Sequence, residues 1–149
     1  MPAFITIGRV LFALLFVISG ASKLLDLAAT AQMTAKIAIP AALAPYASQL
    51  EGATGMAMPQ MLAIAAGALE LICGICIALN FGARFFAIVL ILFVVAATFY
   101  FHDFWNQTGA EARGNLIHAM KNLSLIGALF MIAGYGRGAD MAESAYGDV

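Results

Sequence analysis

The stretch GALELICGICIAL (Gly67–Leu79) decides the fold, because it is long and apolar and contains one charge. Glu70 is the single charged residue between Gly52 and Ala83. Crossing the hydrocarbon core of a bilayer takes about 20 mostly apolar residues as a helix. The stretch therefore predicts a transmembrane helix with a carboxylate inside it, and the purpose of that carboxylate is the main functional question.

The composition of the whole chain favours the same environment. Of its 149 residues, 64% are hydrophobic and 10% are charged, against roughly 25% charged in soluble domains. Four segments reach spanning length, at about residues 4–25, 59–79, 84–101 and 116–135. Lipid gives backbone groups no water partner, so each span must satisfy its own hydrogen bonds as a helix. The sequence predicts an all-α integral membrane four-helix bundle, one domain over residues 1–149.

Charge placement predicts the orientation of these spans. The net charge is −1, which does not favour nucleic acid as a partner. Arg9, Arg84 and Arg137 fall on one side of the four-helix arrangement, and Lys36 and Arg113 on the other. Positive charge near short loops marks the cytoplasmic side, so both termini are expected there. A cleaved signal peptide is the alternative for the amino terminus, but its first apolar stretch is long enough to span and remain.

The connection from Asp26 to Met58 is the long one, and extra structure is expected in it. It combines apolar and small polar residues with prolines at Pro40 and Pro45. This pattern predicts a short interfacial helix followed by an ordered loop.

Glu70 lies about 11 residues into its predicted span, roughly 16 Å from its end. A carboxylate at such depth costs on the order of 2.5 to 3.5 kcal/mol and should face a partner or cavity. We expect a polar pocket with Glu70 at its floor. Catalytic candidates are Glu70, His102, His118 and Lys121, and cofactor-binding candidates are Lys23, Glu70 and Asn122.

Structural alternatives exist for several of these residues. Glu70 could be a protonated side chain that only bonds a neighbouring helix. Lys23 and Lys121 could extend to the lipid head groups. Direct pairing of Lys23 with Glu70 would require helices shifted from the predicted boundaries, because Lys23 is only a few residues inside its span.

Cys73 and Cys76 have C-x-x-C spacing within the second span. Burial in apolar surroundings opposes thiolate formation, and small side chains pack well between membrane helices. A packing role is therefore expected over redox chemistry. No metal site is predicted, because the two His and two Cys are far apart along the chain.

Three segments together resemble the DoxX family of small four-helix bacterial membrane proteins. They are GRVLFALLFVISGASKL near the start, GALELICGICIALNFGAR in the second span and NLIHAMKNLSLIGALFMIAGYGRG near the end. Matching positions are Arg9, Gly20, Lys23, Glu70, Gly74, Gly82, Asn122, Gly134 and Gly136. The resemblance implies a multi-pass protein of the bacterial inner membrane. It also implies association with membrane oxidoreductase systems, including quinone-coupled oxidation of sulfur compounds and complexes that handle oxidative stress.

Three functions fit these observations. The first is a subunit or accessory of a quinone-linked oxidoreductase system, with quinone as the cofactor and a membrane oxidoreductase complex as the partner. The second is a structural or assembly subunit that docks on a larger membrane complex. The third is a small solute or proton carrier, which four helices per chain would form only as a homo-oligomer. Whether the chain itself is an enzyme stays open at this point.

Overall fold

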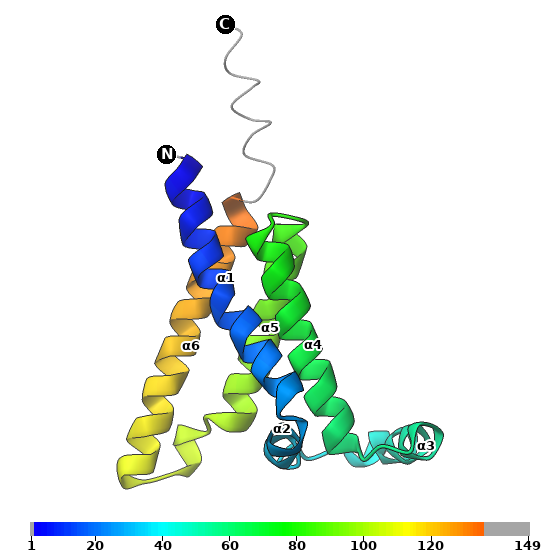
Figure 1. The fold of residues 1–149 in the computed structure, drawn as a ribbon. Helices are drawn as coiled ribbons and strands as arrows, with labels where there is room; N and C mark the ends of the chain where they lie inside the picture. The colour runs from blue at the N-terminus through cyan, green and yellow to red at the C-terminus, as the bar shows by residue number, and fades with distance from the viewer. Residues whose placement is uncertain (1, 136–149) are drawn as a thin grey trace, which may run out of the picture. The chain divides into compact units, whose positions relative to one another are not determined.

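The described part of the chain is almost entirely helical (Figure 1). The computed structural model describes residues 2–135, and Arg137 of the orientation argument and Gly136 of the family resemblance lie outside this range. Within it there is no β-strand, which confirms the all-α prediction. The helices are α1 (Pro2–Leu25), α2 (Leu27–Thr34), α3 (Ala44–Thr54), α4 (Met58–Ala78), α5 (Ala83–Phe101) and α6 (Gly109–Tyr135), with 3-10 turns η1 (Ala41–Leu43) and η2 (Phe104–Asn106).

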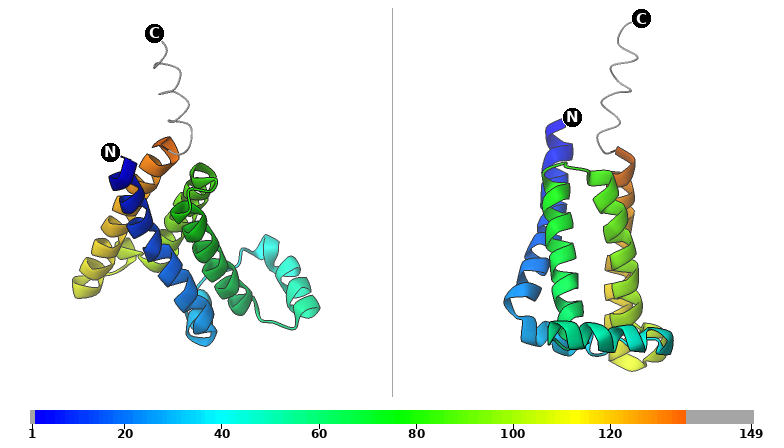
Figure 2. Two further views of the ribbon diagram at one scale, coloured as in Figure 1. Left: turned by 45° about the horizontal axis from the view of Figure 1, so that its top comes forward. Right: turned by 90° about the vertical axis from the view of Figure 1, so that its right-hand side faces the viewer.

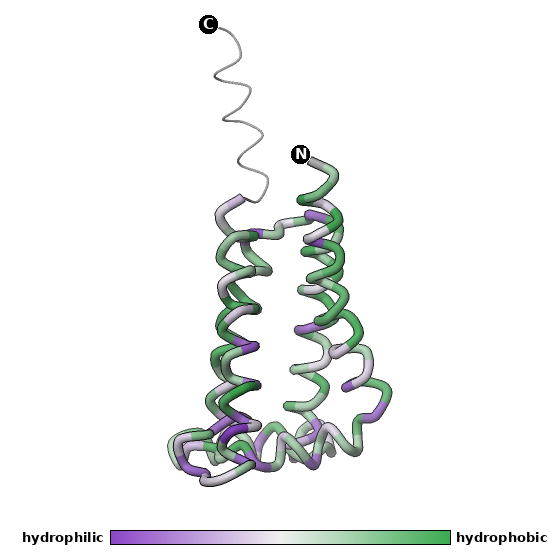
Figure 3. Tube along the Cα trace, turned by 90° about the vertical axis from the view of Figure 1, so that its left-hand side faces the viewer, coloured by the Kyte–Doolittle hydropathy of each residue, from purple (hydrophilic) through white to green (hydrophobic). Residues whose placement is uncertain are grey.

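Four of these helices, α1, α4, α5 and α6, are long and apolar enough to cross a membrane. Their mean hydropathy lies between 1.6 and 2.4 over the most apolar window. Figure 3 shows hydrophobic residues along these helices and hydrophilic residues concentrated at connections. Large apolar side chains such as Leu92 (67% exposed) and Phe130 (62%) face outward. Outward apolar residues are what a helix in lipid requires, and the predicted four-span architecture is confirmed.

α6 begins at Gly109, seven residues before the predicted Leu116. The added segment, GAEARGN, is polar, so a hydropathy window excludes it although it is helical. Glu111 lies in the first turn, where a negative charge is favoured by the helix dipole. The other three spans differ from their predicted ends by no more than two residues.

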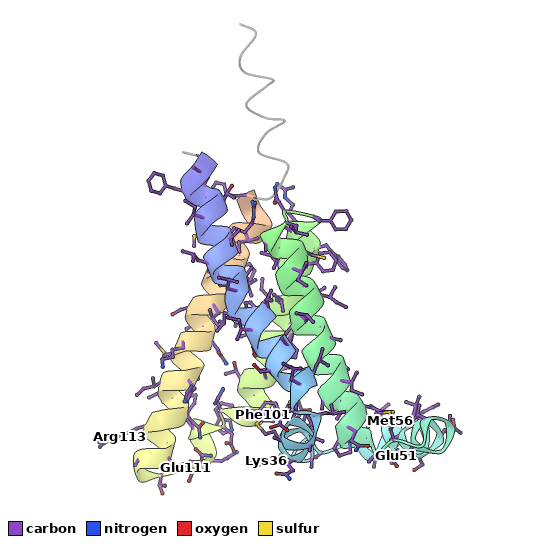
Figure 4. All side chains as sticks on the ribbon, viewed as in Figure 1. Lys36, Glu51, Met56, Phe101, Glu111 and Arg113 are labelled. Carbon is purple, nitrogen blue, oxygen red and sulfur yellow. The ribbon has the colours of Figure 1, made fainter. Side chains whose placement is uncertain are left out.

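The chain divides into two compact units. The first contains residues 1–14 and 73–149, and in its described part α5 and α6 run antiparallel through the η2 turn (Figure 2). Its buried core includes Ala87, Leu90 and Leu129, all fully buried. Figure 4 labels Phe101, Glu111 and Arg113 of this unit, which surround the α5–α6 connection.

The second unit contains residues 15–72: the second half of α1, the whole first connection and most of α4. The connection holds two α-helices, α2 and α3, where one short helix was predicted. Asp26 caps α2 by accepting the Ala29 N–H at 3.1 Å, and Glu51 of α3 accepts the Met58 N–H at 2.7 Å. Figure 4 labels Lys36, Glu51 and Met56 in this connection. The prediction of one domain over residues 1–149 stays a prediction.

Candidate functional site

Glu70 is buried and paired with Lys23 inside the second unit. Lys23 Nζ lies 2.7 Å from Glu70 Oε2, and the two side chains are 24% and 7% exposed. Lys23 Nζ also donates to Ser19 Oγ at 2.6 Å. Glu70 lies 12 residues after α4 begins, or roughly 18 Å along the helix. An ion pair with an additional hydroxyl partner therefore sits well within the length of a membrane span.

Side-chain direction explains why these two residues meet. Cα–Cβ bonds in a helix tilt toward its amino terminus. Lys23, near the end of α1, therefore points back along α1 toward Ser19, while Glu70 points toward the beginning of α4. Because the two helices are antiparallel here, the side chains tilt toward each other.

Two glycines set the register of this helix pair. A Cβ on Gly20 would meet Leu71 N at 2.5 Å and Gly67 O at 2.6 Å, so the two backbones are in direct contact. Gly67 in turn lies against Leu24 and the Gly20 carbonyl. Small residues at such positions let membrane helices approach closely. The close approach places residue 20 opposite residues 67–71. Lys23, on the next turn of α1, is therefore within reach of Glu70.

This register differs from the depth expected for Lys23 from the sequence. Residue 20 lies opposite residues 67–71, so α1, which ends five residues further on, stops before it reaches the start of α4. α2 accompanies the rest of α4, where Thr34 Oγ donates to the Pro59 carbonyl at 2.6 Å. Lys23 is thus deeper relative to α4 than residue counting indicated. It pairs with Glu70 and does not extend away from it.

The first unit holds a second polar group, at the α5–α6 connection. The rings of His102 and His118 are stacked, with centroids 5.0 Å apart and planes at 14°. His102 Nδ1 lies 3.1 Å from Asn115 Oδ1. Asn115 donates to Gln107 Oε1 at 2.6 Å, and Gln107 donates to Asp103 Oδ1 at 3.0 Å.

The direction of this chain of bonds fixes the imidazole of His102. The Asp103 carboxylate accepts, so each amide in turn presents its oxygen to the next donor. Asn115 then offers an acceptor to His102, whose Nδ1 must carry the proton. With Nδ1 as the donor, Nε2 of the neutral ring is the acceptor.

The remaining candidates lie on α6. Asn122 donates to Thr98 Oγ of α5 at 2.9 Å, which ties the two helices together. Lys121 is exposed. The structure thus brings Lys23 to Glu70, and His102 to His118. A single pocket that contains both groups stays a prediction.

Cys73 and Cys76 are free thiols on α4, the first buried and the second half-buried. Among residues 2–135, no three His, Cys, Asp or Glu side chains are grouped as metal ligands would be. The packing role of the two cysteines stays a prediction.

Sequence reasoning missed two hydroxyl partners. Ser19 precedes Lys23 by four residues, and Thr98 precedes His102 by four. That spacing places each on the same helical face as a predicted site residue, so helical periodicity was the available signal. Each is a single small polar residue within an apolar segment, so neither stands out in the sequence.

The fold and the buried ion pair define an α-helical integral membrane protein with four spans and a charged pair inside one helix contact. The sequence model of the DoxX family matches residues 4–103. The chain belongs to the DoxX family. It is 29% identical to the Inner membrane protein YphA of Escherichia coli (strain K12) over 138 residues, which is 93% of this chain and 86% of that protein. No solved structure shows significant similarity to the chain.

Proposed function

We propose that the chain is a membrane subunit or accessory of a quinone-linked oxidoreductase system in the bacterial inner membrane, where Glu70 exchanges protons or contacts a small ligand. The observation that carries this proposal is the Lys23–Glu70 pair, buried within helices of spanning length. Ionisable residues inside spans are costly, and they are typical of proton and ligand pathways. The name of the E. coli relative supports the location.

The chemistry assigned to the pair is proton transfer. Reduction of a quinone to a quinol consumes two electrons and two protons, and oxidation releases them. The partner oxidoreductase would exchange the electrons, and titratable side chains of this chain would exchange protons. Lys23, which also donates to Ser19 Oγ, lies within hydrogen-bond distance of the Glu70 carboxylate and would hold it in place for this exchange. His102 Nε2 offers a second proton-accepting position.

A purely structural role is the second candidate, because the pair is already complete within the chain. Both groups have partners at 2.6–2.7 Å, which is the geometry that a tie between helices requires. This role fits a docking or assembly subunit. The two functions predict different consequences for the same substitution.

The deciding variant is Glu70→Gln, which keeps shape and hydrogen bonding but removes titration. The tagged chain would be purified from its native membranes in mild detergent, with quinone reduction by the co-purified complex and thermal stability measured on the same sample. We expect an unchanged unfolding midpoint and a fall in quinone reduction of tenfold or more. Glu111→Gln, the same change at an exposed position on α6, should leave quinone reduction unchanged and lower the unfolding midpoint only slightly, through the lost interaction with the helix dipole.

The exchange variant Lys23→Glu/Glu70→Lys separates the two roles further. If the pair is only a structural contact between helices, the exchange restores that contact, and both stability and activity should equal those of the parent. A proton-transfer role needs the carboxyl at position 70, so the exchanged protein should be as stable as the parent but inactive. Active but unstable Glu70→Gln protein, or the absence of quinone reduction in every preparation of the parent, would overturn the proposed function.

A further inference from the structure

A separate cavity lies in the first unit, between the start of α1, the α4–α5 turn and the end of α6. Its volume is about 460 Å³, within the usual range for small-ligand sites. In Figure 1 these segments are the blue start of α1, the green turn after α4 and the orange end of α6. The lining is mainly apolar: Ile5, Gly8, Arg9, Phe12, Asn80, Ala128, Met131, Ile132 and Tyr135.

Two polar atoms at this cavity lack partners among the described residues. They are Arg9 Nε, a donor, and Asn80 Oδ1, an acceptor, both buried. Buried polar atoms in proteins are nearly always hydrogen-bonded. A ligand that brings an anionic acceptor to Arg9 and a donor to Asn80 would match these two side chains of the lining.

A comparison with Arg84 shows that Arg9 is unusual among the cations of this unit. Arg84 Nη2, at the start of α5, donates to the Gly134 carbonyl at 3.1 Å, near the end of α6. Its guanidinium is thus engaged by the chain itself, and it is exposed. Arg9 lines an apolar cavity instead, and its Nε has no hydrogen-bond partner among the described residues.

The backbone holds Asn80 rigidly at the cavity. Its N–H donates to Ile77 O at 3.0 Å, and Phe81 N–H donates to Cys76 O at 2.9 Å, the two bonds that close a helix with a left-handed residue. Asn80 has φ of 56°, where glycine is the usual residue. Asparagine is the residue that such caps use in place of glycine, and here it also adds a side chain to the cavity lining.

We propose that this cavity binds a phospholipid, with its phosphodiester on the Arg9 guanidinium, a head-group donor on Asn80 Oδ1 and an acyl chain along the apolar lining. Guanidinium is always charged, and its donors fit phosphate oxygens. A neutral quinone would leave the Arg9 charge uncompensated. The cavity lies at the ends of spans, the level at which lipid phosphates are found.

The test is native mass spectrometry of the full-length, delipidated protein with defined lipids. The probes are phosphatidylglycerol, which has hydroxyl donors, phosphatidylcholine, which has none in its head group, diacylglycerol, which lacks phosphate, a ubiquinone and inorganic phosphate. Phosphatidylglycerol should bind best. Phosphatidylcholine should bind several-fold more weakly, and diacylglycerol about tenfold or more. Millimolar inorganic phosphate should not displace the lipid.

Matched variants test the assigned atoms. Arg9→Gln should weaken phosphatidylglycerol binding by about tenfold or more, whereas Arg84→Gln, with the same charge change in the same unit, should weaken it less than threefold. Asn80→Gly keeps the backbone conformation, so it should remain as stable as the parent and lose the preference for phosphatidylglycerol over phosphatidylcholine.

Four results would overturn the proposal. Equal losses in Arg9→Gln and Arg84→Gln would indicate unspecific charge attraction. Tighter binding of ubiquinone than of phosphatidylglycerol, abolished by Arg9→Gln, would make the cavity a quinone site. Displacement by inorganic phosphate would show that the acyl chain is not recognised. A tenfold gain in lipid binding on neutralising Asp140, Glu143 and Asp148 would assign the Arg9 partner to the chain's own carboxylates.

Discussion

At Gly20 the backbones of α1 and α4 come so close that no side chain fits between them. The nearest atoms to a Cβ at this position belong to the Leu71 and Gly67 backbones, which cannot move independently of α4. At Gly67 the nearest atoms belong instead to the flexible Leu24 side chain, at 2.9 Å. The same methyl group should therefore have different consequences at the two positions.

We predict that Gly20→Ala is destabilised by about 1–3 kcal/mol, the usual range for overpacking, and that Gly67→Ala is affected less. Gly127→Ala on α6, where nothing lies within 4 Å of the added Cβ, should be neutral or slightly stabilising, since alanine favours helix by up to about 1 kcal/mol. Unfolding in detergent followed by circular dichroism gives this order. A Gly20→Ala protein as stable as Gly127→Ala would show that the helices are not in contact there.

α2 is the element that completes the helix contact of the second unit. It is only eight residues long, which is too short for a stable isolated helix. Its hydroxyls attach it on both sides: Thr30 Oγ donates to the Lys23 carbonyl at 3.1 Å, and Thr34 Oγ to the Pro59 carbonyl at 2.6 Å. Both threonines are buried.

We expect Thr34→Val to release α2 from the beginning of α4. The substitution keeps the shape but leaves the Pro59 carbonyl without this donor, at a cost of about 1–3 kcal/mol. Hydrogen exchange should become faster in residues 27–34 and stay unchanged in α5 and α6. Gln32→Ala, an exposed position on the same helix, is the control. Unchanged exchange in both variants would mean that other contacts hold α2.

The positions of the membrane-spanning helices could be predicted because the apolar composition of each segment determines where a span lies. α1, α4 and α5 match the predicted segments closely, since their ends coincide with changes in hydropathy. The start of α6 could not be found this way, because GAEARGN is both polar and helical. α2 and α3 were underestimated because helices of eight and 11 residues depend on tertiary contacts that a local pattern does not contain.

The candidate site was only partly visible in the sequence. Glu70 stands out because a lone charge in a span is conspicuous. Its partner was not assigned, because the pairing of Lys23 depends on the register that Gly20 and Gly67 impose. The cavity at Arg9 was missed altogether, since Asn80 belongs to a four-residue turn that reads as a plain connection.

For the whole molecule, the orientation in the membrane can be predicted and can be measured simply. Ile5, Asn80 and Tyr135 line one cavity, so the start of α1, the α4–α5 turn and the end of α6 are at the same end of the first unit. An even number of spans requires this arrangement. The distribution of Arg and Lys predicts that this end is cytoplasmic.

The prediction is tested by a single cysteine at Ser48, an exposed position on α3, with Cys73 and Cys76 replaced by alanine. If both termini are cytoplasmic, an impermeant maleimide added to intact spheroplasts should label position 48. A cysteine at exposed Arg84 should react only after lysis. The reverse pattern would invert the topology. Failure of the Cys-free parent to fold would show that alanine cannot replace the two thiols in the packing of α4.

The pairing of Lys23 with Glu70 also has a consequence for biosynthesis. The two residues are 47 positions apart, so at ~5–20 residues per second the lysine leaves the ribosome roughly 2–10 s before its counter-ion. During that interval α1 must enter the membrane with an unpaired ammonium. Its position two residues before the end of α1 allows the side chain to extend to the lipid head groups during this interval. We expect α4 to draw the lysine inward when it arrives, so that insertion of the first span is completed only when the second is made.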